Sequence, residues 1–248
     1  MDKNIFKVKG TYVNGEWFNS KNRYDVFNPA NGEKLSDVPI SDNKELELAV
    51  ESAKKAQVAW SKTSLIERAA ALEKLAKKIL EKEEEFALID SYDSGNALTG
   101  MRKDVKETVN NIRYFCGLVR EVKGETFSME NNHLNFTRYQ PYGVVLKINP
   151  FNHPFRFCVE KIAAPLLMGN SLIIKNSEQA PISSLRFCEL LEDIFPKGLI
   201  NVVTGGPENG KYLVEHPDIK RIAVIGSVNT GIAIAKGAAP LLKNVSLE

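Results

Sequence analysis

The stretch that decides the fold is Gly143-Val144-Val145-Leu146-Lys147-Ile148, a nearly continuous apolar run with the length of a β-strand. A helical pattern follows this run as far as Met168, and Gly169-Asn170 ends it. The next apolar run, residues 172–174, again has the length of a strand. Continuous apolar strands that alternate with helices are typical of a parallel sheet whose two faces are both buried.

The same alternation continues along the rest of the sequence. Further strands are expected at residues 200–203, 222–225 and 244–247, and further helices at 181–194 and 228–239. The second of these helices follows a glycine and a serine, and the first opens on a proline that suits a first helical turn. The sequence therefore predicts an α/β fold, a Rossmann-like parallel sheet with helices on both faces.

The residues before this alternation predict two other kinds of structure. Turn signals at Asn14-Gly15 and at residues 28–32 indicate an N-terminal arm or small meander of short strands. Residues 42–123 have a helical pattern, and Ser64 and Glu67 have the spacing of a capping box. Such helices are expected to serve as scaffold.

A helix expected at about residues 102–122, after a break at residues 94–96, is followed by a change of pattern. From Glu125 to Gln140 the residues alternate in a way that suits an extended segment with two unlike faces. This alternation predicts a β-hairpin with Asn131-Asn132 near its turn. Because the hairpin lies between two blocks of different pattern, we expect it to project as an interaction arm.

Composition and charge are those of an ordinary globular protein. Hydrophobic residues make up 43% of the chain and charged residues 26%, and the net charge of +2 gives no basic excess for nucleic acid. The start has no signal-peptide core, and no apolar run approaches the roughly 18 residues of a membrane span. The cysteines are few, odd in number and far apart, and no metal-binding spacing occurs. We expect a cytoplasmic protein with no metal, no membrane partner and no nucleic-acid partner.

Four loops follow the ends of predicted strands, where ligands of parallel sheets bind. Gly226-Ser227 lies between a buried strand and a helix start, where free amides and the helix dipole suit a phosphate. Lys175 and Glu178 follow another strand and could bind paired ribose hydroxyls as donor and acceptor. These residues alone leave a nucleotide site and a set of plain loops equally open. The four loops are residues 149–154, 175–178, 204–207 and 226–231.

Several motifs occur together in one order and spacing. They are Ile148-Asn149-Pro150-Phe151-Asn152-His153-Pro154, residues 163–170, residues 175–181, Gly226-Ser227 and Val245-Ser246-Leu247-Glu248. On these motifs the sequence resembles the aldehyde dehydrogenase superfamily, and weaker similarity extends back to residues 12–17 and 27–29. The resemblance covers almost the whole chain and matches the N-terminal, NAD(P)-binding portion, which ends before the family's catalytic cysteine.

The resemblance implies NAD(P)-dependent oxidation of an aldehyde to a carboxylic acid. In that family a cysteine thiolate attacks the aldehyde, hydride passes from the thiohemiacetal to the nicotinamide, and a glutamate activates water to hydrolyse the thioester. Asn152 matches the asparagine whose amide stabilises the oxyanion. Glu248 matches the general-base glutamate, although its position at the end of this sequence also allows a frayed terminal acid.

The resemblance also implies the cofactor contacts. Lys175 and Glu178 match the pair that holds the adenosine ribose, and a carboxylate there would repel a 2′-phosphate. NAD is therefore favoured, and NADP stays possible. Gly226 and Ser227 match the pyrophosphate contacts. The full set of expected cofactor-binding residues is Ile148, Asn149, Pro150, Phe151, Lys175, Glu178, Gly206, Gly226 and Ser227.

The resemblance further divides the chain into parts. Residues 1–124 and 143–248 would form the cofactor-binding domain, and residues 125–142 the hairpin that the family uses in oligomer contacts, so a homo-oligomer is expected. The catalytic domain would be absent. Surface that this domain normally covers would then be exposed, and we expect the chain by itself to self-associate.

Departures from the family pattern keep other interpretations open. Cys116, Cys158 and Cys188 fall in helical patterns and are expected to be small buried hydrophobes rather than nucleophiles. The chain alone is therefore predicted to be inactive, and a non-catalytic nucleotide-binding module or a naturally truncated homologue remains an alternative. A third interpretation is a relative that transfers the acyl group to coenzyme A, and Glu248 argues against it. The family commonly has a bulky apolar residue at the position of His153, and this difference leaves the identity of the substrate open.

Overall fold

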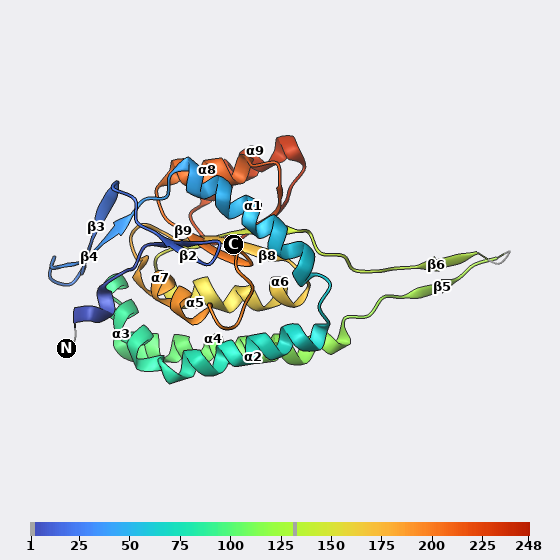
Figure 1. The fold of residues 1–248 in the computed structure, drawn as a ribbon, viewed down its shortest axis with the longest axis horizontal. Coiled ribbons are helices and arrows are strands. Elements are labelled where there is room, and N and C mark those ends of the chain that lie inside the picture. Colours follow the sequence, from blue (N-terminus) through green and yellow to red (C-terminus); the bar gives the residue numbers. More distant parts are fainter. Residues whose placement is uncertain (1–2, 131–132) are drawn as a thin grey trace.

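The centre of the fold is a twisted sheet in a computed structural model that describes residues 3–130 and 133–248 (Figure 1). Within these residues the sheet has seven strands in the order β11-β10-β7-β8-β9-β1-β2. Five neighbouring strands run parallel, as predicted. They are β7 (Val144–Ile148), β8 (Ser171–Lys175), β9 (Ile200–Val203), β10 (Ile219–Val224) and β11 (Asn244–Leu247).

The register of the parallel strands brings their carboxyl ends to one edge. Ile148 at the end of β7 pairs with Lys175 at the end of β8 and with Val224 at the end of β10. The loops that follow these strands therefore begin side by side, although they are far apart in the sequence. This alignment creates the edge at which ligands of such sheets bind.

Helices cover both faces of the sheet, as predicted (Figure 1). One face carries α1 (Asn43–Trp60), α8 (Pro207–Glu215) and α9 (Val228–Ala238). The other carries α2 (Leu65–Glu81), α3 (Glu83–Ser94), α4 (Leu98–Leu118), α5 (Pro154–Val159), α6 (Ala163–Leu167) and α7 (Ile182–Phe187). Each face has its own cluster of buried hydrophobic side chains, because the side chains of each strand point alternately to the two sides. Across residues 3–130 and 133–248, no helix is both long and apolar enough to span a membrane.

Local signals set several helix boundaries. The Ser64 hydroxyl accepts from the Glu67 amide and the Glu67 carboxylate accepts from the Ser64 amide, so the predicted capping box starts α2. Asp42 and Glu45 form a second capping box at α1, which we did not predict. Gly95 has a φ of 78° and ends α3, within the predicted break.

Two predicted helices are interrupted or shorter in the structure. The stretch up to Met168 is divided into α5, a 3₁₀ turn at Glu160–Ile162 and α6. Pro165 explains the division, since it cannot donate to the carbonyl four residues earlier and its ring crowds that carbonyl. The helix expected to end near Ile194 ends at Phe187 and tightens into a 3₁₀ turn.

The N-terminal strands are arranged differently from a single meander. β1 (Thr11–Val13) and β2 (Glu16–Phe18) join the main sheet, because Tyr12 pairs with Val202 of β9. The Asn14-Gly15 turn between them has positive φ at both residues, as an Asn-Gly hairpin turn requires. β3 (Arg23–Phe27) and β4 (Lys34–Pro39) form a separate two-stranded sheet around the predicted turn at residues 28–32.

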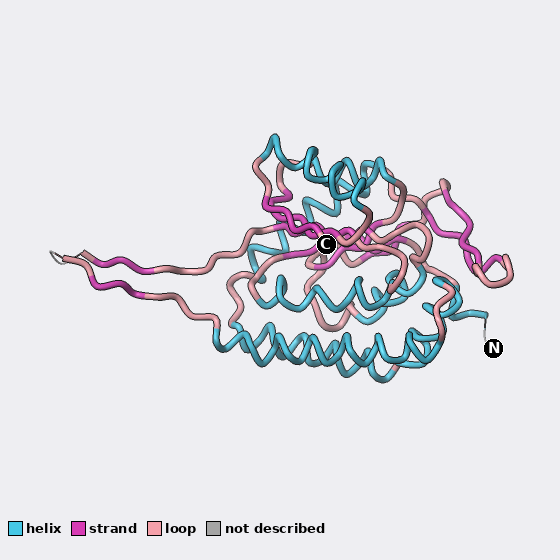
Figure 2. Tube along the Cα trace, turned by 180° about the vertical axis from the view of Figure 1, so that it is seen from behind, coloured by secondary structure: helices cyan, strands magenta, loops and turns pink. Residues whose placement is uncertain are grey.

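A long hairpin projects from the body of the molecule (Figures 1 and 2). It is formed by β5 (Thr126–Ser128) and β6 (Leu134–Phe136), which pair in antiparallel fashion. The hairpin was predicted at this place, and its predicted turn at Asn131-Asn132 lies outside the described residues. All six residues of the two strands are exposed.

Candidate functional site

A large cavity opens at the carboxyl edge of the sheet, between the ends of β7, β8 and β10 and the helices α8 and α9. Its volume of about 990 Å³ is at the upper end of the range for small-molecule sites. Of the sequence-predicted residues, Ile148, Asn149, Pro150, Phe151, Asn152, Lys175, Glu178, Gly226 and Ser227 line this cavity. The strand-end loops thus meet in one place, and the cavity has room for a dinucleotide.

Lys175 and Glu178 stand together in the wall of this cavity. The Lys175 Nζ lies 3.3 Å from the Glu178 Oε2. The lysine side chain is only 7% exposed, whereas that of the glutamate is 44% exposed. Burial lowers the pKa of Lys175, and the neighbouring Glu178 carboxylate offsets part of this effect. The pair therefore presents a fixed donor beside a more accessible acceptor, which is what a ribose diol requires.

The N-terminus of α9 forms another part of the wall. The Ser227 hydroxyl caps this helix by accepting from the Thr230 amide at 3.2 Å. The Gly226 amide donates to the Glu248 carbonyl at 3.1 Å and is therefore already engaged. The amides of Val228 and Asn229 belong to the first helical turn, where an α-helix leaves N–H groups without a partner of its own. These amides, rather than that of Gly226, are the donors that α9 offers to an anion.

Gly206 lies at the edge of the site rather than in it. It is the N-cap residue of α8 and does not line the cavity, whereas Pro207 and Glu208 after it do. The preceding residue, Gly205, has a φ of +122°, and a Cβ there would lie 2.4 Å from the Asn209 side chain. The glycines at this strand end thus serve the turn into α8.

The loop after β7 is held from several sides. Asn149 donates from its side chain to Asn176 at 3.0 Å and from its backbone to the Lys175 carbonyl at 3.1 Å. The Asn152 carbonyl accepts from the side chain of Asn96 at 2.5 Å. Asn152 is exposed and lines the cavity. The loop therefore offers a neutral amide donor at the cavity mouth.

Glu248 lines a second, smaller cavity of about 260 Å³ that shares Asn149 and Ile225 with the first. Its amide donates to the Val224 carbonyl, so it continues the ladder between β10 and β11 and is not frayed. Its carboxylate forms an ion pair with Lys161. Lys147 also lines this cavity, and burial lowers the pKa of its ammonium group to about 8.

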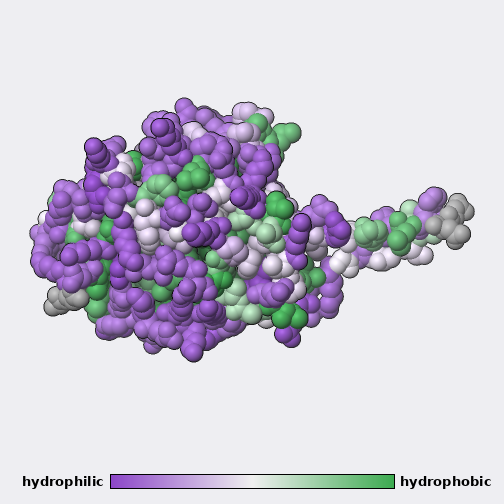
Figure 3. All heavy atoms as spheres, in the orientation of Figure 1, coloured by the Kyte–Doolittle hydropathy of each residue, from purple (hydrophilic) through white to green (hydrophobic). Residues whose placement is uncertain are grey.

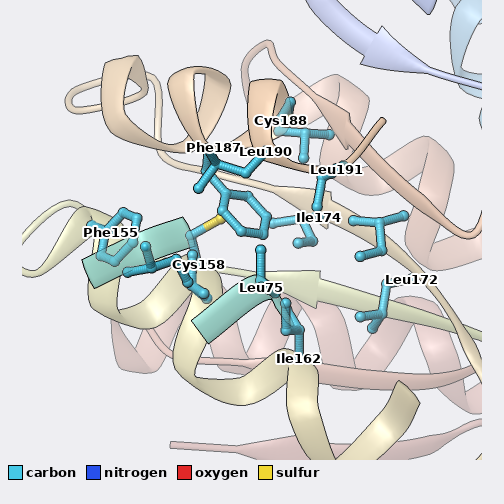
Figure 4. Close-up of a cluster of buried hydrophobic side chains, with 14 of the residues drawn as sticks. Leu75, Phe155, Cys158, Ile162, Leu172, Ile174, Phe187, Cys188, Leu190 and Leu191 are labelled. Atoms are coloured by element: carbon cyan, nitrogen blue, oxygen red, sulfur yellow. The ribbon is translucent and has the colours of Figure 1, made fainter. Parts of the chain in front are cut away.

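The three cysteines offer no nucleophile in this structure. Cys158 and Cys188 are fully buried among apolar side chains such as Phe155 and Phe187 (Figure 4). Burial raises the pKa of Cys158 to about 12 and that of Cys116 to about 11, so both stay thiols at neutral pH. No group of three metal-ligating side chains is present in residues 3–130 and 133–248.

Some residues at or beside the site were not predicted from the sequence. Lys161 was not predicted, and its charge alone does not distinguish it, because Arg156 and Glu160 lie in the same helical segment before Met168. Asn96 and Asp104 were also missed. Asp104 accepts from the ring of His153 at 2.5 Å, a contact between residues far apart in the sequence. No local pattern of the sequence indicates this pair.

Known proteins resemble this chain over nearly its whole length. The sequence profile described as "Aldehyde dehydrogenase family" matches residues 17–248. The aldehyde dehydrogenase tropH of Talaromyces stipitatus is 36% identical over 243 residues, which are 96% of this chain and 47% of that protein. The hydroxyisobutyraldehyde dehydrogenase of Mycolicibacterium austroafricanum is 36% identical over 241 residues, 96% of this chain and 48% of its own. The chain thus spans about half the length of these curated relatives.

Solved structures agree with these sequence relatives. A Staphylococcus aureus betaine aldehyde dehydrogenase in complex with NAD+ superposes with a TM-score of 0.93 at 32% identity, over 97% of this chain and 49% of that chain. An aldehyde dehydrogenase from Bacillus cereus, also in complex with NAD+, gives the same TM-score at 34% identity, over 98% of this chain and 50% of that one. From its matched residues and its fold, the chain belongs to the aldehyde dehydrogenase family.

Proposed function

We propose that this chain forms the cofactor-binding part of an enzyme that uses NAD to oxidise an aldehyde to a carboxylic acid. The proposal rests on one observation. Lys175, Glu178, Ser227 and Asn152 line the same cavity. A ribose-binding pair, a helix N-terminus and a neutral amide donor thus face the same space. The NAD+ complexes of the S. aureus and B. cereus relatives support this choice of cofactor.

The wall of the cavity fits the parts of a dinucleotide. Glu178 would accept from the adenosine ribose and Lys175 would donate to it, and the Glu178 carboxylate would repel the 2′-phosphate of NADP. The first-turn amides of α9 and the Ser227 hydroxyl would hold the pyrophosphate. Residues 148–151 would lie against the nicotinamide. When bound there, NAD supplies the hydride acceptor of the reaction.

Two side chains of this chain would take part in the reaction of the aldehyde. Asn152 would donate to the carbonyl oxygen as negative charge develops on it. Glu248 would take a proton from the water that releases the acid, and Lys161 would orient its carboxylate. Because all three cysteines of the chain are buried, we expect the attacking thiolate to come from outside these 248 residues.

The projecting hairpin would join copies of the protein into a homo-oligomer. Its exposed side chains include Phe127, Leu134 and Phe136, and Figure 3 shows hydrophobic residues along this part of the molecule. Apolar side chains on an arm held away from the body cannot be covered by the chain itself. A second copy is the simplest cover for it.

Two measurements on the chain test this proposal. Calorimetric titration with NAD should show binding, and its absence would refute the cofactor assignment. Mixing the chain with NAD and a panel of aldehydes should give no NADH, because no exposed thiol is present. If NADH forms after every longer protein has been removed, the interpretation of the cysteines is wrong.

A third measurement tests whether the natural polypeptide also contains the rest of the enzyme. The intact mass of the protein from its own cells shows whether it matches the 27.7 kDa of this chain. A larger mass, with a later cysteine, supports a complete aldehyde dehydrogenase. A mass that matches favours the nucleotide-binding module that the sequence left open.

A further inference from the structure

The loop that carries Asn152 combines a free side chain with a fixed backbone. Within residues 3–130 and 133–248, the side-chain amide of Asn152 has no hydrogen-bond partner, and Asn152 is an exposed residue in the lining of the cavity. The backbone around it is held by residues in or between α3 and α4. Asn96 donates to the Asn152 carbonyl at 2.5 Å, and the buried Asp90 carboxylate accepts from the Phe155 amide at 2.9 Å.

A third hold on this loop comes from Asp104 on α4. This aspartate is only 5% exposed, and its two oxygens contact two different residues of the neighbouring segment. One oxygen lies 2.5 Å from the ring Nδ1 of His153, the residue directly after Asn152. The other lies 3.3 Å from the Arg156 guanidinium in the first turn of α5. Asp104 thus ties the end of the loop and the start of the helix to one point.

These contacts belong to a longer polar seam between α4 and the segment that follows Asn152. Arg156 also pairs with Glu160 at 2.6 Å, and Glu160 accepts from the side chain of Asn111 at 2.6 Å. Asp104 and Asn111 are seven residues apart and therefore share one face of α4. The polar seam is defined by Asp104, Asn111, His153, Arg156 and Glu160. The Asp104 end of this seam contacts the Asn152 loop, and the Asn111 end does not.

Stability alone does not explain the buried Asp104 carboxylate, whose partners His153 and Arg156 are 38% and 35% exposed. Apolar residues of similar size often stabilise a helix contact at least as well as buried ion pairs do. What directed polar contacts add is a fixed register, because they are satisfied in one arrangement only. Asp104 thereby holds His153, the residue next to Asn152 in the lining of the cavity.

We propose that Asp104 is a positioning residue, which acts through His153 to fix the Asn152 amide at the mouth of the cavity. The inference rests on the proposed role of Asn152 as oxyanion donor. Such a donor is effective only when it is in place before charge develops. A displacement of about 1 Å can lower a catalytic rate on the order of 10²-fold, so holding the Asn152 amide in place would preserve the rate.

The test compares two substitutions in the same seam by ¹H–¹⁵N NMR of the 248-residue chain. Asp104→Ala removes the end that meets the loop, and Asn111→Ala removes the other end. We expect Asp104→Ala to reduce the order parameter of the Asn152 backbone amide below about 0.6. It should also speed amide exchange at Phe155 about tenfold or more. Asn111→Ala should leave both readouts at their wild-type values.

Two further variants keep the proposal testable if Asp104→Ala does not fold. Asp104→Asn retains an acceptor for the His153 Nδ1–H and should keep Asn152 ordered. His153→Phe keeps an aromatic ring but no hydrogen bond, and it should release Asn152 as Asp104→Ala does. If Asp104→Ala and Asn111→Ala change Asn152 equally, or if His153→Phe leaves it ordered, the proposal is wrong.

The NMR measurements need neither cofactor nor aldehyde, so their outcome does not depend on whether the proposed function is right. If the wild-type chain fails to bind NAD, the proposed function fails while the NMR comparison still reports on Asp104. If NAD binds normally and Asn152 is insensitive to both Asp104 and His153, only the positioning role is refuted.

Discussion

Glu178 should decide which dinucleotide the cavity prefers. Its carboxylate is the accessible member of the pair with Lys175, so it would accept from a ribose hydroxyl and repel a phosphate. Replacing a charged acceptor by a neutral one costs about 1.4 kcal/mol, or a factor of ten in Kd. Glu178→Gln should therefore lower the preference for NAD over NADP about tenfold, as measured by calorimetric titration with both cofactors.

The matched control is Glu33→Gln, which makes the same change of charge on the surface. Glu33 pairs with Lys3 and does not line the cavity. It should leave the ratio of the two dissociation constants unchanged. If Glu178→Gln also leaves this ratio unchanged, the ribose assignment is refuted.

Asp90 should make stability depend on pH. Its side chain is buried, its Oδ1 has no partner among the described residues, and burial raises its pKa to about 7. An aspartate in the unfolded chain has a pKa near 3.9. The native state therefore binds the proton more tightly, so the stabilisation is complete below about pH 4 and is lost as the pH rises towards 7.

The substitution Asp90→Asn tests this linkage, because an amide stays neutral at every pH and can still accept from the Phe155 amide. In urea unfolding, the variant should gain stability over wild type between pH 5 and pH 8, by a few kcal/mol. A constant difference between Asp90→Asn and wild type would mean that Asp90 does not titrate in this range.

The side chains that directly follow a strand could be predicted from the sequence. Lys175 and Ser227 could be predicted because the ends of parallel strands share one edge of the sheet. Lys161 could not, because its partner Glu248 is 87 residues away in the sequence. The hydrogen bond of the Gly226 amide could not be predicted either, because only the fold shows that the Glu248 carbonyl accepts from it.

Among the elements, α2 offers a direct test of the capping box. The Ser64 hydroxyl accepts from the Glu67 amide at 3.2 Å and satisfies one of the free donors at the helix start. Ser64→Ala should lower the free energy of unfolding by about 1 kcal/mol. Ser64→Asp, which keeps an acceptor and suits the positive end of the helix, should stay close to wild type. Equal losses in both variants, measured by urea unfolding, would argue against the cap.

Element boundaries were predicted where a local signal sets them. The capping box gave the start of α2, and the break at residues 94–96 contains the end of α3. The helix to Met168 was predicted as continuous, since its apolar pattern continues through Pro165. The missing donor of this proline divides it into α5, a 3₁₀ turn and α6. A periodic pattern alone does not report such an interruption.

For the whole molecule, the sheet with its two helical layers could be predicted because each parallel strand is a continuous apolar run. The place of the N-terminal strands could not. β1 joins β9 through the pairing of Tyr12 with Val202, and nothing near Tyr12 in the sequence indicates this partner. The candidate site depends mainly on the parallel strands, so most of it could be predicted although the outer strands were not placed.

The hairpin leads to a prediction about assembly. Phe127 and Phe136 are 45% and 59% exposed on β5 and β6, away from the body of the molecule. Phe136 pairs with Thr126 and Phe127 pairs with Asn135, so the two rings lie on opposite faces of the hairpin. Each face of the hairpin thus exposes an apolar side chain, and apolar surface that is exposed in this way marks contacts with partners. We therefore expect the wild-type chain to associate, and Phe127→Ser with Phe136→Ser to shift it towards the monomer in sedimentation velocity.

This shift should occur without loss of the fold, because neither ring packs in the buried clusters of the sheet. The double variant should keep the circular dichroism spectrum and the unfolding midpoint of wild type. Asn135→Ser is the matched control, since Asn135 pairs directly with Phe127 across the hairpin but is polar already. It should leave the sedimentation coefficient unchanged. A wild-type chain that sediments as a monomer at the same concentration would show that the hairpin's apolar side chains do not join two copies.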